Sequence, residues 1–225
     1  MRFDQPASDI RCEWGLRGLW ELQPATDVVI VVDVLSFSTG VDIATARGAL
    51  VYPQPRQAGV KAADRVGGYS LSPASLLTIP AGYRLDLPSP NGGAICAAAT
   101  SNHVLTACLR NASAVAAAAA KLGSTYALIP AGETWDGGEV RPCLEDLAGA
   151  GAVIACLPGE RSPEAELAAA VFERFRGELP AVLRRCGSGR ELVERGFAED
   201  VELAAGHDVS SNVPILLDRA FRGRP

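Results

Sequence analysis

The chain has 225 residues, enough for one large α/β domain or two small ones with a substantial core. Its 48% hydrophobic and 21% charged residues are typical of a globular protein, and its formal charge of -5 disfavours non-specific binding to nucleic acid. The sequence starts without the apolar core of a signal peptide, and no apolar run is long enough to span a bilayer, so we expect a cytoplasmic protein with no membrane partner.

In chain order, apolar strand patterns alternate with helical patterns. The expected strands are residues 10–14, 28–34, 49–52, 104–107, 126–130 and 215–217, with one short strand inside an irregular segment at 67–90. The expected helices are residues 39–47, 57–66, 92–99, 112–122, 144–156 and 163–176, then short pieces through residue 203. Gly15 and Gly18 indicate a loop after the first strand. This alternation predicts a three-layer α/β/α fold with a mainly parallel sheet, which we expect to be a single domain over residues 1–225.

Residues 28–32 read Val-Val-Ile-Val-Val and form the strongest strand pattern, and Asp33 follows them directly. A run this apolar is typical of a strand buried on both faces of a parallel sheet. The carboxylate at its end would then lie in the crevice where such sheets bind ligands. The hydroxyls of Ser36, Ser38 and Thr39 suit a turn into a helix that receives an anion, which indicates metal-assisted phosphate chemistry. Asp33 acting only as a helix cap is an equally open interpretation.

A second loop of the same kind reads Ser89-Pro90-Asn91-Gly92-Gly93 and leads into a predicted helix. Paired glycines let backbone N–H groups approach an anion, and Ser89 and Asn91 add side-chain hydrogen bonds. Pro-Asn-Gly-Gly is also a common tight turn, so a purely structural role stays open.

A third loop delivers Glu133 after the strand at 126–130, and Glu145 and Asp146 begin the next helix. Acids in the first turn of a helix are often only favourable partners for its dipole. With Asp33, however, several carboxylates become available at strand ends, as Mg²⁺ requires when a substrate phosphate completes its coordination. We therefore expect Asp33, Asn91, Glu133 and Asp146 to converge at one edge of the sheet.

Other chemistries find little support in the sequence. Six cysteines without a Cys-x-x-Cys pair and only two histidines make structural zinc or a disulfide framework improbable, so any metal should be a hard cation held by oxygen. No P-loop or Gly-x-Ser-x-Gly motif occurs. Asp33 also lacks the second aspartate two residues later that haloacid dehalogenase-type phosphatases carry.

The three loops, taken together and in this order, resemble the 2-phosphosulfolactate phosphatase family. The resemblance spans nearly the whole chain and runs through residues 12–15, 31–39, 89–92, 109–111, 131–133, 144–151, 189–192, 196–197, 200–201 and 213–214. It implies a magnesium-dependent phosphatase of α/β/α architecture that acts on the phosphate ester of a small 2-hydroxy acid. The family often carries an arginine where this chain has Ser36, a difference that bears on the choice of an anionic substrate.

This interpretation assigns roles to the loop residues. Asp33 and Asp146 are the expected catalytic residues, and with Glu133 they are the expected ligands of Mg²⁺. The expected substrate-binding residues are Ser36, Ser38, Thr39, Ser89, Asn91, Gly92 and Gly93. The nucleophile is either water or Asp33 itself. A non-catalytic small-anion-binding protein, a phosphatase of another metabolite, and assembly into a homo-oligomer all stay open.

Overall fold

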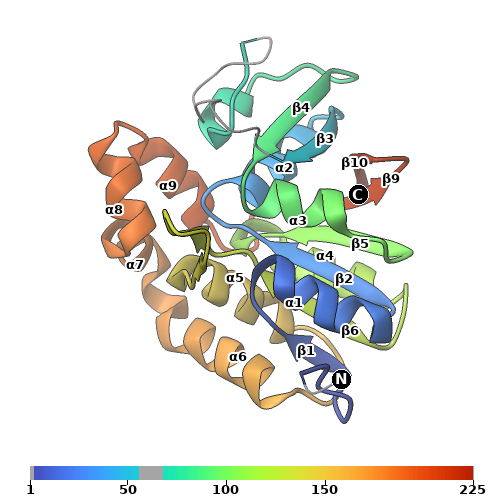
Figure 1. The fold of residues 1–225 in the computed structure, drawn as a ribbon. Coiled ribbons are helices and arrows are strands. Elements are labelled where there is room, and N and C mark those ends of the chain that lie inside the picture. Colours follow the sequence, from blue (N-terminus) through green and yellow to red (C-terminus); the bar gives the residue numbers. More distant parts are fainter. Residues whose placement is uncertain (1–2, 56–67, 225) are drawn as a thin grey trace.

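The computed structural model describes residues 3–55 and 68–224, which form an eight-stranded sheet with helices on both faces (Figure 1). The strand order is β1-β6-β2-β5-β9-β10-β3-β4. The strands are β1 (Ile10–Cys12), β2 (Val28–Val32), β3 (Leu50–Pro55), β4 (Arg84–Ser89), β5 (His103–Ala107), β6 (Tyr126–Pro130), β9 (Val213–Leu217) and β10 (Ala220–Arg224). A separate small hairpin pairs β7 (Glu133–Thr134) with β8 (Val140–Arg141).

The sheet is mainly parallel, as predicted. β1, β6, β2 and β5 run parallel to one another, and β3 and β4 form a second parallel pair. Between these two parts lies the β9–β10 hairpin, whose pairings with β5 and β3 are antiparallel. The carboxyl ends of β2 and β6 therefore meet at one edge of the sheet.

Helices cover both faces of this sheet. They are α1 (Gly15–Leu22), α2 (Phe37–Ala46), α3 (Gly92–Ala98), α4 (Ala112–Ala119), α5 (Leu144–Ile154), α6 (Pro163–Phe175), α7 (Leu179–Arg185), α8 (Gly187–Glu194) and α9 (Ala198–Ala205). Short 3-10 turns are η1 (Gln23–Ala25), η2 (Pro73–Leu76), η3 (Leu109–Asn111) and η4 (Arg176–Glu178). In Figure 1, α1 and α3 lie in front of the sheet, while α4 and α5 lie behind it.

Strand β2 explains the three layers. All five of its side chains are fully buried, and they alternate between two hydrophobic cores. Val28, Ile30 and Val32 belong to the core built with α4, α5 and α6, whereas Val29 and Val31 belong to the core built with α1, α2 and α3. The predicted strand buried on both faces and the α/β/α architecture are confirmed.

Small residues let α5 approach the sheet closely. A Cβ atom built on Gly149 would lie 2.6 Å from Val34 Cγ2, and one on Gly151 would overlap the carbonyl oxygen of Ala168 in α6. The glycines thus allow α5 to pack tightly against both the strand end and α6. As a result, the first turn of α5, which carries Asp146, comes up against the end of β2.

One expectation about local structure was wrong, and one strand of the main sheet was not predicted. The loop predicted at Gly15 and Gly18 is helix α1, in which Gly15 has a φ of +63° and Gly18 lies against the backbone of Glu13, where a Cβ would be 2.6 Å from the Glu13 carbonyl carbon. Strand β10 was not predicted, and it follows a turn in which Asp218 and Arg219 both have positive φ. The helix predicted at 57–66 lies outside the described residues.

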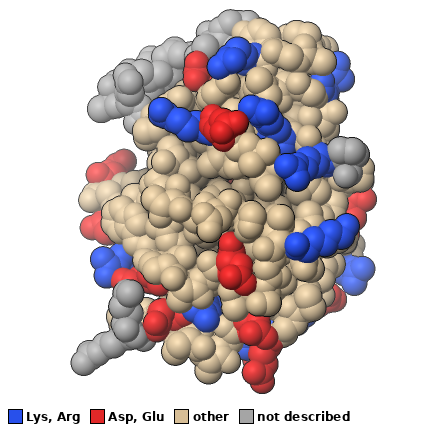
Figure 2. All heavy atoms as spheres, turned by 90° about the vertical axis from the view of Figure 1, so that its right-hand side faces the viewer, with Lys and Arg blue, Asp and Glu red and all other residues tan. Residues whose placement is uncertain are grey.

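The surface of the described residues carries charges of both signs. Figure 2 shows the face on the far side from α8, where Lys and Arg are more numerous toward the top and Asp and Glu toward the bottom. Uncharged residues separate these groups, so neither sign dominates the whole face. In the described part of the chain, none of the helices combines the length and the apolar character needed to cross a bilayer.

Candidate active site

The turn after β2 holds Asp33, which is only 4% exposed. Its Oδ1 accepts a hydrogen bond from the N–H of Phe37, the first residue of α2, at 3.2 Å. Its Oδ2 accepts from the N–H of Gly92 at 2.8 Å and from the hydroxyl of Ser89 at 3.4 Å. Asp33 therefore satisfies an N–H at the start of a helix, as the capping interpretation expected, and also ties this turn to the loop after β4.

The loop after β4 approaches Asp33 closely because it contains Gly92. A Cβ at this position would lie 2.7 Å from both Cβ and Oδ2 of Asp33, and 2.8 Å from the ring of Phe37. Asn91, one residue earlier, donates from Nδ2 to Glu133 Oε1 at 2.9 Å. Asn91 Oδ1 accepts from the hydroxyl of Thr134 at 3.1 Å. The turn thus connects the end of β2 with the loop after β6.

Asp146 completes these connections from the first turn of α5. Its Oδ1 accepts from the N–H of Val34 at 2.7 Å, and its Oδ2 accepts from the N–H of Gly132 at 2.9 Å. The carboxylate is 3% exposed, so each of these backbone groups has its hydrogen-bond partner inside the protein. Asp146 joins the turn after β2 to the turn after β6.

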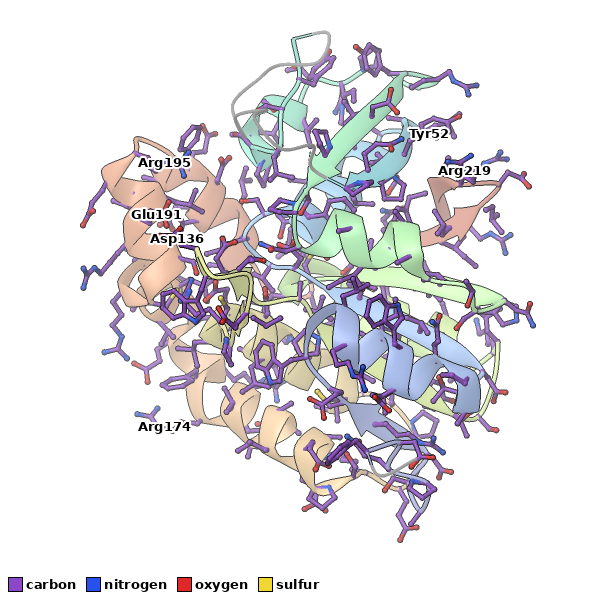
Figure 3. All side chains as sticks on the ribbon, viewed as in Figure 1. Tyr52, Asp136, Arg174, Glu191, Arg195 and Arg219 are labelled. Atoms are coloured by element: carbon purple, nitrogen blue, oxygen red, sulfur yellow. The ribbon has the colours of Figure 1, made fainter. Side chains whose placement is uncertain are left out.

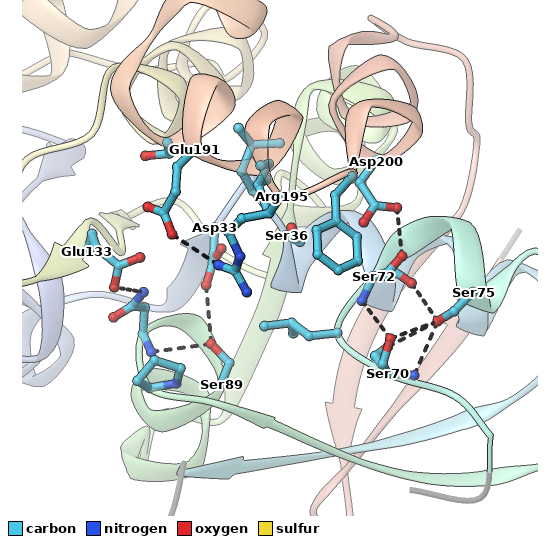
Figure 4. A pocket seen from close by; sticks show the side chains of 17 residues that line it. Asp33, Ser36, Ser70, Ser72, Ser75, Ser89, Glu133, Glu191, Arg195 and Asp200 are labelled. Atoms are coloured by element: carbon cyan, nitrogen blue, oxygen red, sulfur yellow. Dashed lines mark hydrogen bonds and ion pairs between the residues drawn. The ribbon is translucent and has the colours of Figure 1, made fainter. Parts of the chain in front are cut away.

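The structure brings Asp33, Asn91, Glu133 and Asp146 together, although up to 113 positions separate them in the sequence (Asp33 to Asp146). They lie beside a cavity of about 360 Å³, a size that suits a small metabolite. The predicted site residues that line this cavity are Asp33, Ser36, Ser89, Asn91 and Glu133 (Figure 4). The other predicted site residues, Ser38, Thr39, Gly92, Gly93 and Asp146, do not line the cavity.

The hydroxyls of Ser38 and Thr39 are engaged within the protein. Thr39 donates to the carbonyl oxygen of Val34 at 2.8 Å. Ser38 Oγ accepts from the N–H of Asp33 and lies 2.6 Å from Thr106 Oγ1, which itself donates to a backbone carbonyl. Ser38 must therefore donate its hydrogen to Thr106. Their substrate-binding role stays a prediction, while the geometry gives both residues the task of holding the turn around Asp33.

The acidic side chains perturb one another electrostatically. Burial raises the pKa of Asp33 to about 6, with further raising by the charges of Glu133 and Glu145, against the lowering effect of the N–H groups of Gly92 and Phe37. Burial, followed by the charges of Asp33 and Glu145, raises the pKa of Asp146 well above its usual range. No arginine or lysine among the described residues forms an ion pair with these four acids. Such a crowded set of carboxylates favours binding of a cation.

The oxygen donors beside the cavity bear on the predicted Mg²⁺. Within residues 3–55 and 68–224, no three Asp, Glu, His or Cys side chains form a preassembled metal site. Mg²⁺ is commonly held by only one or two carboxylates, with waters and substrate phosphate as the remaining ligands. Asp33 and Glu133 both line the cavity and offer hard oxygen donors of this kind, so the residues fit an ion that binds together with its substrate.

Sequence reasoning missed the opposite wall of the cavity. This wall comes from the segment around η2 and from α8 and α9, none of which belongs to the three predicted loops. Its polar members are Ser70, Ser72, Ser75, Ser188, Glu191, Arg195 and Asp200. Asp200 joins α9 to the segment around η2, because its Oδ1 accepts from the Ser72 hydroxyl and the Ala74 N–H, both at 2.8 Å. Within the motifs that carried the family resemblance, Glu191, Phe197 and Asp200 were the available signals for this wall.

Comparison with known proteins bears on the identity of this site. The family model described as 2-phosphosulpholactate phosphatase matches residues 57–219, which include the loops of Asn91, Glu133 and Asp146. The 2-phosphosulfolactate phosphatase of Methanothermobacter thermautotrophicus is 30% identical over 217 residues, covering 90% of this chain and 92% of the relative. The chain belongs to the 2-phosphosulfolactate phosphatase family.

Other relatives of this family match over a similar length. A probable 2-phosphosulfolactate phosphatase of Carboxydothermus hydrogenoformans is 31% identical over 215 residues, covering 86% of this chain and 88% of the relative. One of Deinococcus radiodurans is 29% identical over 215 residues, covering 85% and 88%. The family resemblance predicted from the ordered loops is confirmed, and the family name describes a phosphoric monoester hydrolase.

Proposed function

We propose that the protein is a magnesium-dependent phosphatase that hydrolyses the phosphate monoester of a small 2-hydroxy acid, with 2-phosphosulfolactate as the first compound to test. The observation that carries this proposal is the group of carboxylates around Asp33 at the edge of a small cavity, in which burial raises the pKa of Asp33 and of Asp146. Family membership supports the reaction class.

The charges around the cavity support the requirement for a metal. Four acids, Asp33, Glu133, Glu191 and Asp200, line it, against the single described cation Arg195. A phosphate ester would be repelled by this lining in the absence of a cation. A divalent ion reverses the local charge and, when bound, stabilises the charge that develops on the phosphate oxygens during transfer.

Asp33 and Glu133 are the proposed ligands. Glu133 Oε1 accepts two hydrogen bonds, from Asn91 Nδ2 and the N–H of Thr134, which leaves Oε2 as its oxygen for the ion. Asp33 Oδ1 accepts a single N–H and so retains a lone pair. Asp146 does not line the cavity, and its two oxygens hold the turns of Val34 and Gly132, so we assign it a positioning role in place of direct ligation.

The proposed reaction uses water as the nucleophile. An acyl phosphate on Asp33 would weaken the charge-assisted hydrogen bonds from Phe37 and Gly92 that hold this carboxylate, whereas attack by water keeps them intact. The water oxygen bonds to phosphorus, the phosphorus–ester oxygen bond breaks, and the departing hydroxy acid keeps that oxygen and gains the proton that the attacking water loses. We assign the hydroxyl of Ser36, which lines the cavity, to donate to the phosphate, whereas the hydroxyl of Ser89 donates to Asp33 Oδ2.

Phosphate release from a panel of compounds tests this function. The panel contains 2-phosphosulfolactate, 2-phospholactate and isopropyl phosphate, each assayed with Mg²⁺ and after exhaustive chelation. We expect turnover of the phospho-acids that disappears on chelation and returns with Mg²⁺. Full activity without divalent ions would refute the metal requirement, and binding without turnover would favour the anion-binding alternative.

A further inference from the structure

Arg195 stands out in the wall that faces the acidic loops. It directly follows α8, and it is the one cationic side chain among the described residues that line the cavity. Its Nη1 donates to Glu191 Oε1 at 3.0 Å, and its guanidinium carbon lies 5.7 Å from the centre of the Phe197 ring. Figure 4 shows the guanidinium directed into the cavity, toward the side on which Asp33 and Ser36 lie. The two contacts hold a planar donor group over the space that a substrate would occupy.

This guanidinium has donor capacity left for a ligand. An arginine carries five N–H donors, and the bond to Glu191 uses one of them. The side chain is 49% exposed, so it reaches the cavity without being locked into a buried ion pair. Its fork geometry matches a carboxylate or sulfonate better than it matches a neutral group.

We propose that Arg195 is a specificity-determining residue that binds the second acid group of the substrate, the carboxylate or sulfonate carried by the hydroxy acid, while the phosphate lies at the Asp33 end of the cavity. This inference rests on the proposed function, because it assumes that the substrate is a phosphate ester with a further acid group. The charge pattern supports this division. The acids Asp33 and Glu133 suit a cation and its phosphate at one end, whereas the opposite wall, which also carries Glu191 and Asp200, holds Arg195, the one cation among the described lining residues.

The chain offers a closely matched control in Arg174. This residue also pairs with a glutamate four positions away, Glu178 at 2.7 Å, and also lies over a phenylalanine ring, that of Phe175 at 4.9 Å. It differs in location, because it extends outward from α6 and does not line the cavity (Figure 3). Arg174→Gln therefore removes the same charge and the same kinds of contact without touching the proposed binding position.

The kinetic test compares substrates that differ in the second acid group. For Arg195→Gln we expect the ratio of kcat/KM for 2-phosphosulfolactate to that for isopropyl phosphate to fall about tenfold, mainly through KM, with partial rescue in Arg195→Lys. We expect a loss of selectivity no larger than this because the Arg195 side chain is half exposed, and solvent weakens the interactions of an exposed charge. Arg174→Gln should keep the parental ratio. The double variant Arg195→Gln/Glu191→Gln should show the same loss of selectivity, which excludes repulsion by an unpaired Glu191 as its cause.

A binding measurement separates failure of this inference from failure of the proposed function. Titration calorimetry of sulfolactate, the expected product, should give about tenfold weaker binding to Arg195→Gln than to the parent. If the parent releases no phosphate but shows this difference, the reaction is wrong and the role of Arg195 stands. If the selectivity ratio is unchanged, or both substrates lose equally, or sulfolactate binds the parent and Arg195→Gln alike or not at all, the role of Arg195 is refuted.

Discussion

Replacing Asp146 with asparagine sets two effects of known direction against each other. The amide can accept from only one of the two N–H groups, so either Val34 or Gly132 loses its buried partner, at a cost of about 1–3 kcal/mol. The substitution also removes a buried negative charge that Asp33 and Glu145 repel, which recovers part of that cost. We expect the lost hydrogen bond to dominate and the variant to be about 1–2 kcal/mol less stable at pH 7 without added metal. For a chain of this length, the unfolding temperature should fall by roughly 2–8 °C.

Urea unfolding and thermal unfolding, each followed by circular dichroism, measure this difference. The control is Asp86→Asn, the same chemical change at an exposed position whose carboxylate accepts a side-chain bond from Gln54 at 3.3 Å, and it should alter stability by less than about 0.5 kcal/mol. If Asp146→Asn is as stable as the parent protein or more stable, repulsion outweighs the backbone hydrogen bonds. The positioning role assigned to Asp146 would then be wrong.

Three further substitutions test other parts of the account. Gly92→Ala places a methyl group within 2.7 Å of the Asp33 carboxylate and should lower kcat at least about tenfold with a stability loss of about 1–3 kcal/mol, whereas parental kinetics would show that the contact is unimportant. Ser36→Arg adds a guanidinium beside the cavity and should lower KM for doubly anionic phospho-acids relative to singly charged esters; an unchanged substrate ranking would exclude this position from substrate selection. Arg110→Ala removes the 2.9 Å ion-pair partner of buried Asp42 and should cost about 3 kcal/mol in urea unfolding, and a loss below about 1 kcal/mol would contradict this.

Features encoded by short stretches of sequence were predictable. The run at 28–32 identified β2 because five consecutive apolar, β-branched residues are typical of a short strand covered on both faces, and all five are buried. Because parallel strands end at the same edge of the sheet, Asp33 and Asp146 could be expected to meet there. In the structure, Asp146 Oδ1 accepts a hydrogen bond from the N–H of Val34, the residue after Asp33.

Features that depend on tertiary packing were not predictable in this way. Gly18 was interpreted as a loop signal, although it is needed in α1 because the backbone of Glu13 leaves no room for a Cβ. The wall of the cavity that carries Arg195 also escaped prediction, because nothing in the local sequence around α8 specifies which part of the sheet edge it faces. The partner of Ser38 also depends on tertiary packing, since its hydroxyl donates to Thr106, 68 positions away in the sequence.

The most direct test of the central claim is the rate of phosphate release from 2-phosphosulfolactate by the parent protein and by Asp33→Asn, both saturated with Mg²⁺. If Asp33 helps to hold the ion at the reacting phosphate, the isosteric amide should lower kcat by at least about a hundredfold, while circular dichroism shows an intact fold. A kcat equal to that of the parent protein would contradict the catalytic role of Asp33 and, with it, the active site proposed around it.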